Sequence, residues 1–245
     1  MIQFQEVQKV FGNRKKTVHA LKGINFRVES GEIFGLLGPN GAGKTTALRI
    51  LSTLLQPTSG EAHVGGFHTV RDSREVRKQI GFLSSDMNLS GNLSARDYIT
   101  FFGRLNHIPE VSLKKRVESL LEYFDMKDYA DRKVATYSTG MKQKTLISIA
   151  LVHEPSIVVF DEPTNGLDVM TAKLVLDSLR ELRQQGKTVV LSTHQMDVAQ
   201  KMCDRLAIID HGEVKAMGTL DEILSSSGSK DLEEAFFAVV KEDAQ

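Results

Sequence analysis

The sequence predicts an α/β fold: a parallel-sheet core with an N-terminal antiparallel β subdomain and an inserted helical subdomain. Three observations support this prediction. Polar and apolar residues alternate over residues 1–30, residues from about 86 to 153 show helical periodicity, and short apolar runs then alternate with helical segments. Because strands that alternate with helices form parallel sheets with crossover helices, the helical stretch divides an α/β core into two sequence halves.

The N-terminal segment has the pattern of a strand with one buried face. Ile24, Phe26 and Val28 alternate with polar residues, which is typical of an antiparallel strand that faces water on one side. A Ser-Gly turn leads into the apolar run Ile33–Leu37, which predicts a buried strand. A second small β segment is expected around Glu61–Phe67.

The remaining elements follow from periodicity. We expect helices over Thr45–Leu55, Ala95–Leu105, Leu113–Phe124, Gly140–Val152, Val169–Gln185, Met196–Cys203 and Leu232–Val240, and strands over Ile157–Phe160, Thr188–Leu191 and Leu206–Ile209. The Ser/Gly-rich stretch at 225–229 is expected to be a flexible link. We expect residues 1–220 to form a single domain with a helical subdomain at about 86–153, and residues 221–245 to form a C-terminal extension with a short helix.

Composition excludes several classes of protein. The chain has 245 residues, with 41% hydrophobic and 25% charged residues, which is ordinary for a globular protein. Its 31 basic and 31 acidic residues give a net charge of zero, which argues against a strongly electrostatic nucleic-acid binder but not against a local basic patch. The single cysteine, Cys203, fits a reducing compartment and is interpreted as a small buried hydrophobe rather than a reactive thiol.

The sequence lacks the signals of a membrane span and of a secretory leader. No window approaches the roughly 18 consecutive apolar residues that a spanning helix needs. The N-terminus alternates like a strand instead of running apolar. We therefore expect that the chain does not cross a bilayer by itself.

A glycine-rich segment after the first buried strand carries the strongest functional signal. Residues 38–45 fit the pattern G-x-x-x-x-G-K-[ST], and a strand precedes and a helix follows the segment, as a phosphate-binding loop requires. The expected nucleotide contacts are Gly38, Pro39, Asn40, Gly41, Ala42, Gly43, Lys44, Thr45 and Thr46. The competing interpretation is a glycine-rich turn with Lys44 as a solvated surface lysine.

The chemistry of this segment suits a nucleoside triphosphate. Glycines let backbone N–H groups point inward at phosphate oxygens, and the helix N-terminus adds partial positive charge. Lys44 can reach the β- and γ-phosphates, and the Thr45 hydroxyl can ligate Mg²⁺. The loop alone predicts nucleotide binding without saying what the energy is used for.

Two carboxylates end the apolar strand Ile157–Phe160. The carboxyl ends of parallel strands are where α/β folds place ligands. Asp161 is suited to hold the hydration shell of Mg²⁺ opposite Thr45, and Glu162 could orient and deprotonate an attacking water. Alternatively, the two residues are simply a polar strand end before the turn at Pro163.

Three further segments are ambiguous from their chemistry alone. Ser138 is a good helix N-cap and Gly140 permits close backbone approach, so residues 137–143 predict a helix cap or an anion site. Asp168 could cap the helix that starts at Val169. His194 follows a predicted core strand, where it either faces the phosphates or is a surface or capping residue.

The order of these motifs resembles the ATP-binding subunit of an ABC transporter. A phosphate loop, a helical insertion, a Ser-x-Gly helix opening, an Asp-Glu strand end, a Gly-Leu-Asp turn and a histidine follow one another over residues 1–220. Residues 160–171 and the tail 232–237 are similar to bacterial exporters with a separate membrane chain, of the sodium-extrusion group. The resemblance implies a P-loop NTPase (ABC ATPase) core that hydrolyses ATP with Mg²⁺.

The resemblance also implies roles and partners. Lys44, Glu162 and His194 would be catalytic, Phe11 would stack on adenine, and Asp168 would signal between two sites. Ser138 and Gly140 would contact the γ-phosphate of ATP bound to a second copy of the chain, or to a homologous ATPase. The implied partner is an integral membrane permease. This chain would be a peripheral subunit at the cytoplasmic face of the membrane, and no nucleic acid is implied.

The sequence departs from the family pattern at three positions. Thr139 stands where glycine is common, and Phe11 replaces the frequent tyrosine, although stacking needs only a ring face. Ser85 stands where the family usually has a glutamine that touches Mg²⁺. Ser85 remains a candidate metal contact, but it is too short to copy glutamine, so a bridging water or Asp86 would act instead.

The sequence also bears on two functions other than transport. An ABC-type ATPase that acts on ribosomes usually has two ATPase domains, and the DNA-repair type carries long coiled coils, whereas this chain has one domain and no basic excess. A regulatory subunit that barely hydrolyses is disfavoured by intact Lys44, Asp161, Glu162 and His194. The transported substrate stays open among sodium, drugs, peptides and lipids.

Overall fold

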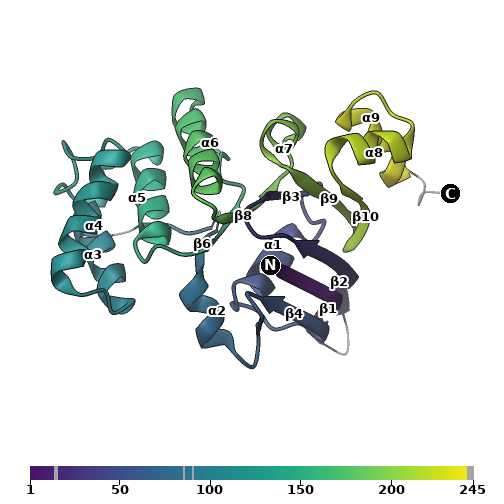
Figure 1. Cartoon of the computed structure of the whole chain (residues 1–245), viewed down its shortest axis with the longest axis horizontal. Coiled ribbons are helices and arrows are strands. Elements are labelled where there is room, and N and C mark those ends of the chain that lie inside the picture. The colour runs from purple at the N-terminus through teal and green to yellow at the C-terminus, as the bar shows by residue number, and fades with distance from the viewer. Residues whose placement is uncertain (14–15, 85, 90, 242–245) are drawn as a thin grey trace.

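The computed structural model describes residues 1–13, 16–84, 86–89 and 91–241, and it contains two sheets (Figure 1). The smaller sheet is antiparallel in the order β2-β1-β4-β5. Its strands are β1 (Ile2–Asn13), β2 (Lys16–Val28), β4 (Ser59–Val64) and β5 (Phe67–His68). Ile24, Phe26 and Val28 are buried while the residues between them are exposed, which confirms the alternating pattern.

The larger sheet carries the predicted parallel core. Its order is β10-β9-β3-β8-β7-β6, and all of its neighbours pair in parallel except β9 and β10. The strands are β3 (Ile33–Leu37), β6 (Ile80–Leu83), β7 (Ile157–Asp161), β8 (Thr188–Thr193), β9 (Arg205–Asp210) and β10 (Glu213–Gly218). Strands β3, β7 and β8 are buried along their whole length, which explains their largely apolar sequence.

Helices cover both faces of this sheet, and further helices lie beyond its two edges. They are α1 (Lys44–Leu51), α2 (Ser73–Gln79), α3 (Ala95–Leu105), α4 (Glu110–Tyr123), α5 (Thr139–Leu151), α6 (Val169–Gln184), α7 (Met196–Met202), α8 (Leu220–Ser227) and α9 (Leu232–Lys241), with a 3₁₀ turn η1 at Val134–Thr136. Helices α3, α4 and α5 lie at one end of the molecule, and α8 and α9 lie at the other (Figure 1).

The two halves of the sequence share continuous cores. Helix α1 packs between the sheets, with Leu48 and Leu51 in one cluster with Phe4 and Phe34. On the opposite face, side chains of α4, α5 and α6 pack in one cluster with β7 and β8. The helical insertion is therefore joined to the sheet through buried apolar contacts, so it can hold a fixed geometry relative to the strand ends.

Two local predictions were wrong. Residues 225–227 end helix α8 and are not a flexible link, since Thr219 and Glu222 form a capping box and Gly228 closes the helix in a left-handed conformation. Helix α1 stops at Leu51 instead of Leu55. There Thr53 adopts a positive φ of 63°, which breaks the helical run.

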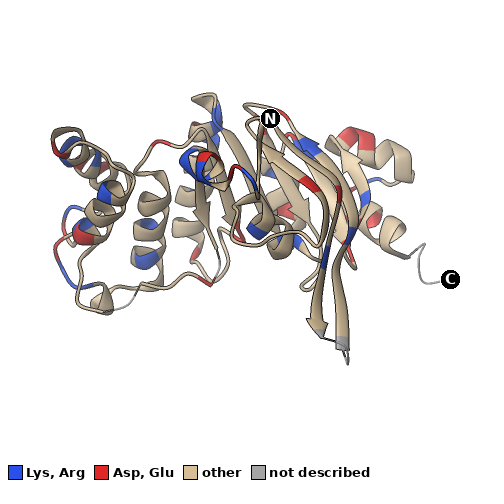
Figure 2. Ribbon diagram, turned by 90° about the horizontal axis from the view of Figure 1, so that it is seen from below, with Lys and Arg blue, Asp and Glu red and all other residues tan. Residues whose placement is uncertain are grey.

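Charges of both signs are interspersed along the whole ribbon (Figure 2). This arrangement agrees with the neutral net charge. Among the helices of the described ranges, none combines the length and the apolar character that crossing a bilayer requires.

Candidate functional site

The phosphate loop occupies the turn between β3 and α1, at the carboxyl end of the parallel sheet. Gly43 is the N-cap of α1 with φ 109° and offers no side-chain cap, so the first N–H groups of the helix have no side-chain acceptor at the cap. A Cβ at Gly38 would lie 2.1 Å from the carbonyl oxygen of Ile209, so only glycine fits there. The loop thus presents backbone donors and partial positive charge to a bound anion.

Lys44 places a buried cation in this loop. Its ammonium donates to the carbonyl oxygens of Gly38 at 2.7 Å and Pro39 at 3.1 Å, and it lies 3.5 Å from Glu162 Oε1. The side chain is only 5% exposed, so the alternative of a solvated surface lysine is wrong. A buried ammonium held this way is placed to meet phosphate oxygens.

Thr45 and Asp161 meet across the site. The Thr45 hydroxyl donates to Asp161 Oδ2 at 2.9 Å, and the buried Ser192 hydroxyl donates to Asp161 Oδ1 at 2.5 Å. A hydroxyl and a carboxylate that face each other are the oxygen ligands that Mg²⁺ prefers, so these residues fit the metal predicted for them. Within the described residues, no cluster of three or more His, Cys, Asp or Glu side chains forms a separate metal site.

Glu162 lies directly beside this pair in a constrained conformation. Its φ is 53°, and its N–H donates to the hydroxyl of Ser192 at 3.0 Å and to the carbonyl of Ser192 at 3.2 Å. A non-glycine residue with this φ costs about 1–3 kcal/mol, and such strain collects at functional sites. The hydrogen bonds to β8 hold the residue in place despite this cost.

The two carboxylate oxygens of Glu162 have different surroundings. Oε2 lies 2.9 Å from His194 Nδ1. Oε1 is buried, forms the ion pair with Lys44, and accepts no hydrogen bond from the described residues. A buried carboxylate oxygen that can still accept a proton is what a general base requires.

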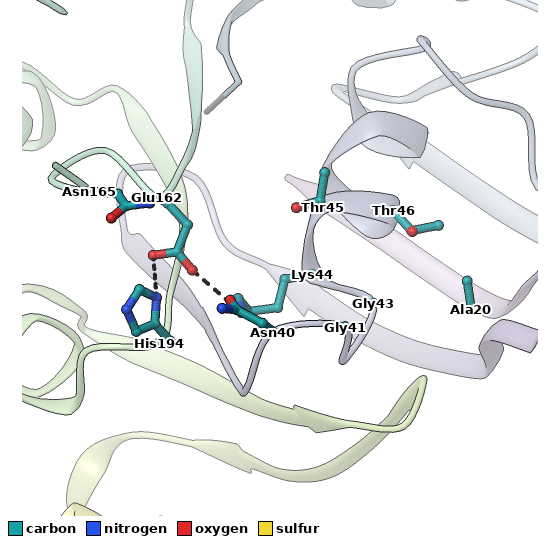
Figure 3. Close-up of a pocket in the computed structure, with 10 residues that line it drawn as sticks. All are labelled: Ala20, Asn40, Gly41, Gly43, Lys44, Thr45, Thr46, Glu162, Asn165 and His194. Carbon is teal, nitrogen blue, oxygen red and sulfur yellow. Dashed lines mark hydrogen bonds and ion pairs between the residues drawn. The ribbon is translucent and has the colours of Figure 1, made fainter. Parts of the chain in front are cut away.

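These side chains line one cavity of about 400 Å³ (Figure 3). Glu162 and His194 face Lys44 across the cavity, and Thr45 and Thr46 extend along its far side. The lining residues are Ala20, Asn40, Gly41, Gly43, Lys44, Thr45, Thr46, Glu162, Asn165 and His194. His194 therefore faces the phosphate loop, as one of its two interpretations predicted.

Ser138, Gly140 and Asp168 lie elsewhere on the same chain. The Ser138 hydroxyl caps α5 by accepting the N–H of Met141 at 3.3 Å. Asp168 caps α6, and its pKa lies below the usual range because the Thr171 hydroxyl and backbone N–H groups donate to it. Both capping predictions are confirmed. All three residues are outside the described lining of the cavity.

Phe11, the residue predicted to stack on adenine, and the segment predicted to contact the metal lie near a neighbouring surface. Phe11 is 42% exposed and lines a second hollow together with Thr46, Arg49 and Asp86. Ser85 lies outside the described residues. Asp86 accepts from Arg49 at 2.6 Å and from the Ser84 hydroxyl, and these bonds hold its pKa below the usual range, with the Ser84 bond as the main cause.

Sequence reasoning missed three residues of the site. Ser192 bridges Asp161 and Glu162, while Ala20 and Asn165 line the cavity. Ser192 is brought to the site by the register of β7 and β8, which pairs it with Asp161, and the sequence alone does not specify that register. Nothing in the local sequence signals Ala20, which comes from the opposite sheet.

A phosphate loop and an Asp-Glu strand end at the same edge of a parallel sheet define a nucleoside triphosphatase of the P-loop type. Residues 21–165 match the ABC transporter family. The ABC transporter ATP-binding protein NatA of Bacillus subtilis is 38% identical over 239 residues, covering 97% of both chains.

Other similar proteins include transporters of both directions. The Nod factor export ATP-binding protein I of Paraburkholderia xenovorans is 37% identical over 96% of this chain and 76% of its own length. A methionine import ATP-binding protein of Bacillus cereus is 35% identical over 100% of this chain and 73% of its own length. A solved dimeric ATP-binding cassette in a post-hydrolysis state, bound to ADP and phosphate, is 30% identical with a TM-score of 0.83, covering 90% of this chain and 99% of that one.

The chain belongs to the ABC transporter family, as an ATP-binding subunit that hydrolyses ATP. The α/β P-loop fold with an antiparallel N-terminal sheet is confirmed by the same neighbours.

Proposed function

We propose that this subunit powers export of a solute through a separate integral membrane permease, by ATP-driven closure of two ATPase subunits. The observation that carries the proposal is the separation of the site into two parts. Loop residues, Glu162 and His194 line one cavity, whereas Ser138 is exposed outside it on the same chain. Such a division suits a site completed by a second subunit.

Residues in and beside the cavity have distinct chemical roles in nucleotide binding and hydrolysis. The loop N–H groups and Lys44 bind the phosphates and stabilise charge on the transferring group. Glu162 accepts a proton from the attacking water through Oε1, the oxygen that accepts no hydrogen bond from the described residues, and His194 orients Glu162 through its 2.9 Å contact. Thr45 and Asp161 would hold Mg²⁺, which neutralises phosphate charge when bound. Phe11 stacks on the adenine ring.

The second subunit supplies the remaining contacts. We infer that Ser138 and Gly140 of the other copy, or of a homologous ATPase, meet the γ-phosphate across the interface. Asp168 lies at the start of α6 and passes information between the two sites. In this arrangement a monomer binds ATP but hydrolyses it poorly, because half of the transition-state contacts are missing.

We further propose that the chain sits at the cytoplasmic face of the cell membrane as a peripheral subunit. Support for export comes from the similarity to a Nod factor export protein and from the segments at 160–171 and 232–237 that resemble the sodium-extrusion group. The similarity to a methionine import protein supports the alternative, in which the permease imports its solute. Co-purification of the permease from the source cell, followed by transport in vesicles, distinguishes the two.

Glu162→Gln tests the ATPase part of the proposal. The amide keeps the shape of the side chain but cannot accept the proton, so hydrolysis should fall about 10²-fold or more. ATP binding should be retained, and light scattering should show an ATP-dependent dimer that persists. Hydrolysis at the parental rate would contradict the role of Glu162 as the base.

A further inference from the structure

The N-terminal turns of helices α5 and α6 lie against each other within one chain. A Cβ at Gly140, in the first turn of α5, would lie 3.0 Å from Thr171 Oγ1 and 3.3 Å from Thr171 Cγ2. Thr171 belongs to the first turn of α6. Distances this short mean that the α5 backbone packs directly on the Thr171 side chain, and a larger residue at Gly140 would have to displace it.

The same threonine holds the Asp168 carboxylate. Its hydroxyl donates to Asp168 Oδ2 at 2.7 Å, while Asp168 Oδ1 accepts the N–H groups of Met170 and Thr171 at 3.0 Å each. Both carboxylate oxygens are therefore engaged. The Thr171 side chain thus both fixes the Asp168 turn and contacts the first turn of α5.

A second contact ties the same segments one turn further along α5. Gln143 Nε2 donates to the carbonyl of Pro163 at 3.3 Å, and Pro163 directly follows Glu162. Helix α5 is thus joined to the 162–171 segment at two points. Two attachment points restrict rotation of α5 about either one, so the helix opening and the segment should move together.

We propose that Thr171 is a positioning residue that fixes the α5 opening, with Ser138 and Gly140, relative to the Asp168 turn. This inference rests on the proposed function, in which both segments meet the ATP of a second subunit. Thr171 itself touches no substrate. It places the two segments in one geometry before the subunits close, so that closure does not have to order them.

Steady-state ATP hydrolysis and binding of a fluorescent ATP analogue test this role. Thr171→Val keeps the methyl contact with Gly140 and removes the hydroxyl that holds Asp168. It should lower kcat about tenfold, while the dissociation constant of the analogue changes less than about twofold. Thr171→Ser keeps the hydroxyl and should stay within about threefold of the parental kcat.

Thr219→Val is the matched control for loss of a threonine hydroxyl at a helix start. Thr219 caps α8 by accepting the N–H of Glu222 at 3.2 Å, away from the cavity. It should lower the melting temperature and leave kcat unchanged. A parental kcat in Thr171→Val, or a parallel loss of analogue binding and kcat there, would overturn the positioning role.

A double variant tests the contact itself. Gly140→Ala should slow hydrolysis because its Cβ meets Thr171, and adding Thr171→Ala removes that obstacle. The double variant should therefore be no slower than the slower single variant, and multiplied losses would refute the contact. If the parental chain itself neither dimerises with ATP nor hydrolyses it, the proposed function fails instead.

Discussion

Ser192→Ala is a sharp test of how the site is built. The Ser192 hydroxyl is fully buried, donates to Asp161 Oδ1 at 2.5 Å and accepts the N–H of Glu162 at 3.0 Å. A hydrogen bond to a charged group contributes about 1.5–3 kcal/mol. Thr45 also donates to Asp161, and the carbonyl of Ser192 also accepts the Glu162 N–H, so the site should survive in a loosened form.

The expected loss is therefore about 1.5–3 kcal/mol in the free energy of unfolding, measured by urea titration. Because Asp161 and Glu162 lose a shared support, kcat should also fall about 10- to 100-fold. Ser148→Ala is the control, since the Ser148 hydroxyl is equally buried but donates to the backbone carbonyl of Lys144 in its own helix. That variant should change stability by less than about 0.5 kcal/mol and leave kcat alone. If Ser192→Ala behaved like Ser148→Ala, the bridging role would be refuted.

Three further predictions concern the loop, a helix cap and the cysteine. Gly38→Ala puts a Cβ 2.1 Å from a carbonyl oxygen of β9 and should abolish binding of a fluorescent ATP analogue, whereas Gly41→Ala meets no atom within 4 Å and should only weaken it. Asp168 has a pKa lowered first by the Thr171 hydroxyl, so its ionised form stabilises the fold above the unfolded pKa of about 3.9 and loses this effect as pH falls through the folded pKa. The stability difference between parent and Asp168→Asn should thus shrink from pH 7 to pH 3 in urea titrations, and an unchanged difference would contradict the cap. Burial raises the pKa of the Cys203 thiol to about 12. The thiol should therefore react with a disulfide reagent at pH 8 at least tenfold faster in urea than in buffer. Equal rates would show that the thiol is accessible in the folded chain.

The phosphate loop, the carboxylates after β7 and the serine cap of α5 could be predicted from local sequence chemistry. The glycine pattern of the loop, the carboxylates after β7 and the serine at the start of α5 each act within a few residues. Their spacing alone therefore identifies them. Lys44 was placed correctly because a strand and a helix enclose the loop in the sequence.

The rest depended on which strands become neighbours. Ser192 and His194 reach Asp161 and Glu162 only because β8 pairs beside β7 in a particular register. A single sequence contains no record of that pairing. The contact between Gly140 and Thr171 likewise needs the packing of two helices.

Helix α8 was missed for a different reason. Its Ser- and Gly-rich end suggested a linker, although Thr219 and Glu222 form a recognisable capping box. Packing of Ile223 in a core with Leu206 and Ile208 of β9 also stabilises this helix. Composition was therefore a poorer guide than the capping signal.

The central claim is that each ATP site is shared by two chains. In a Glu162→Gln background, Lys44→Ala removes the loop half of the site and Ser138→Arg removes the other half. Either variant alone should retain almost no ATP after gel filtration. Mixing them forms pairs in which one site has both intact halves, so mixed dimers should retain about one ATP per two chains. Retention no greater in the mixture than in the separate variants would contradict the shared site.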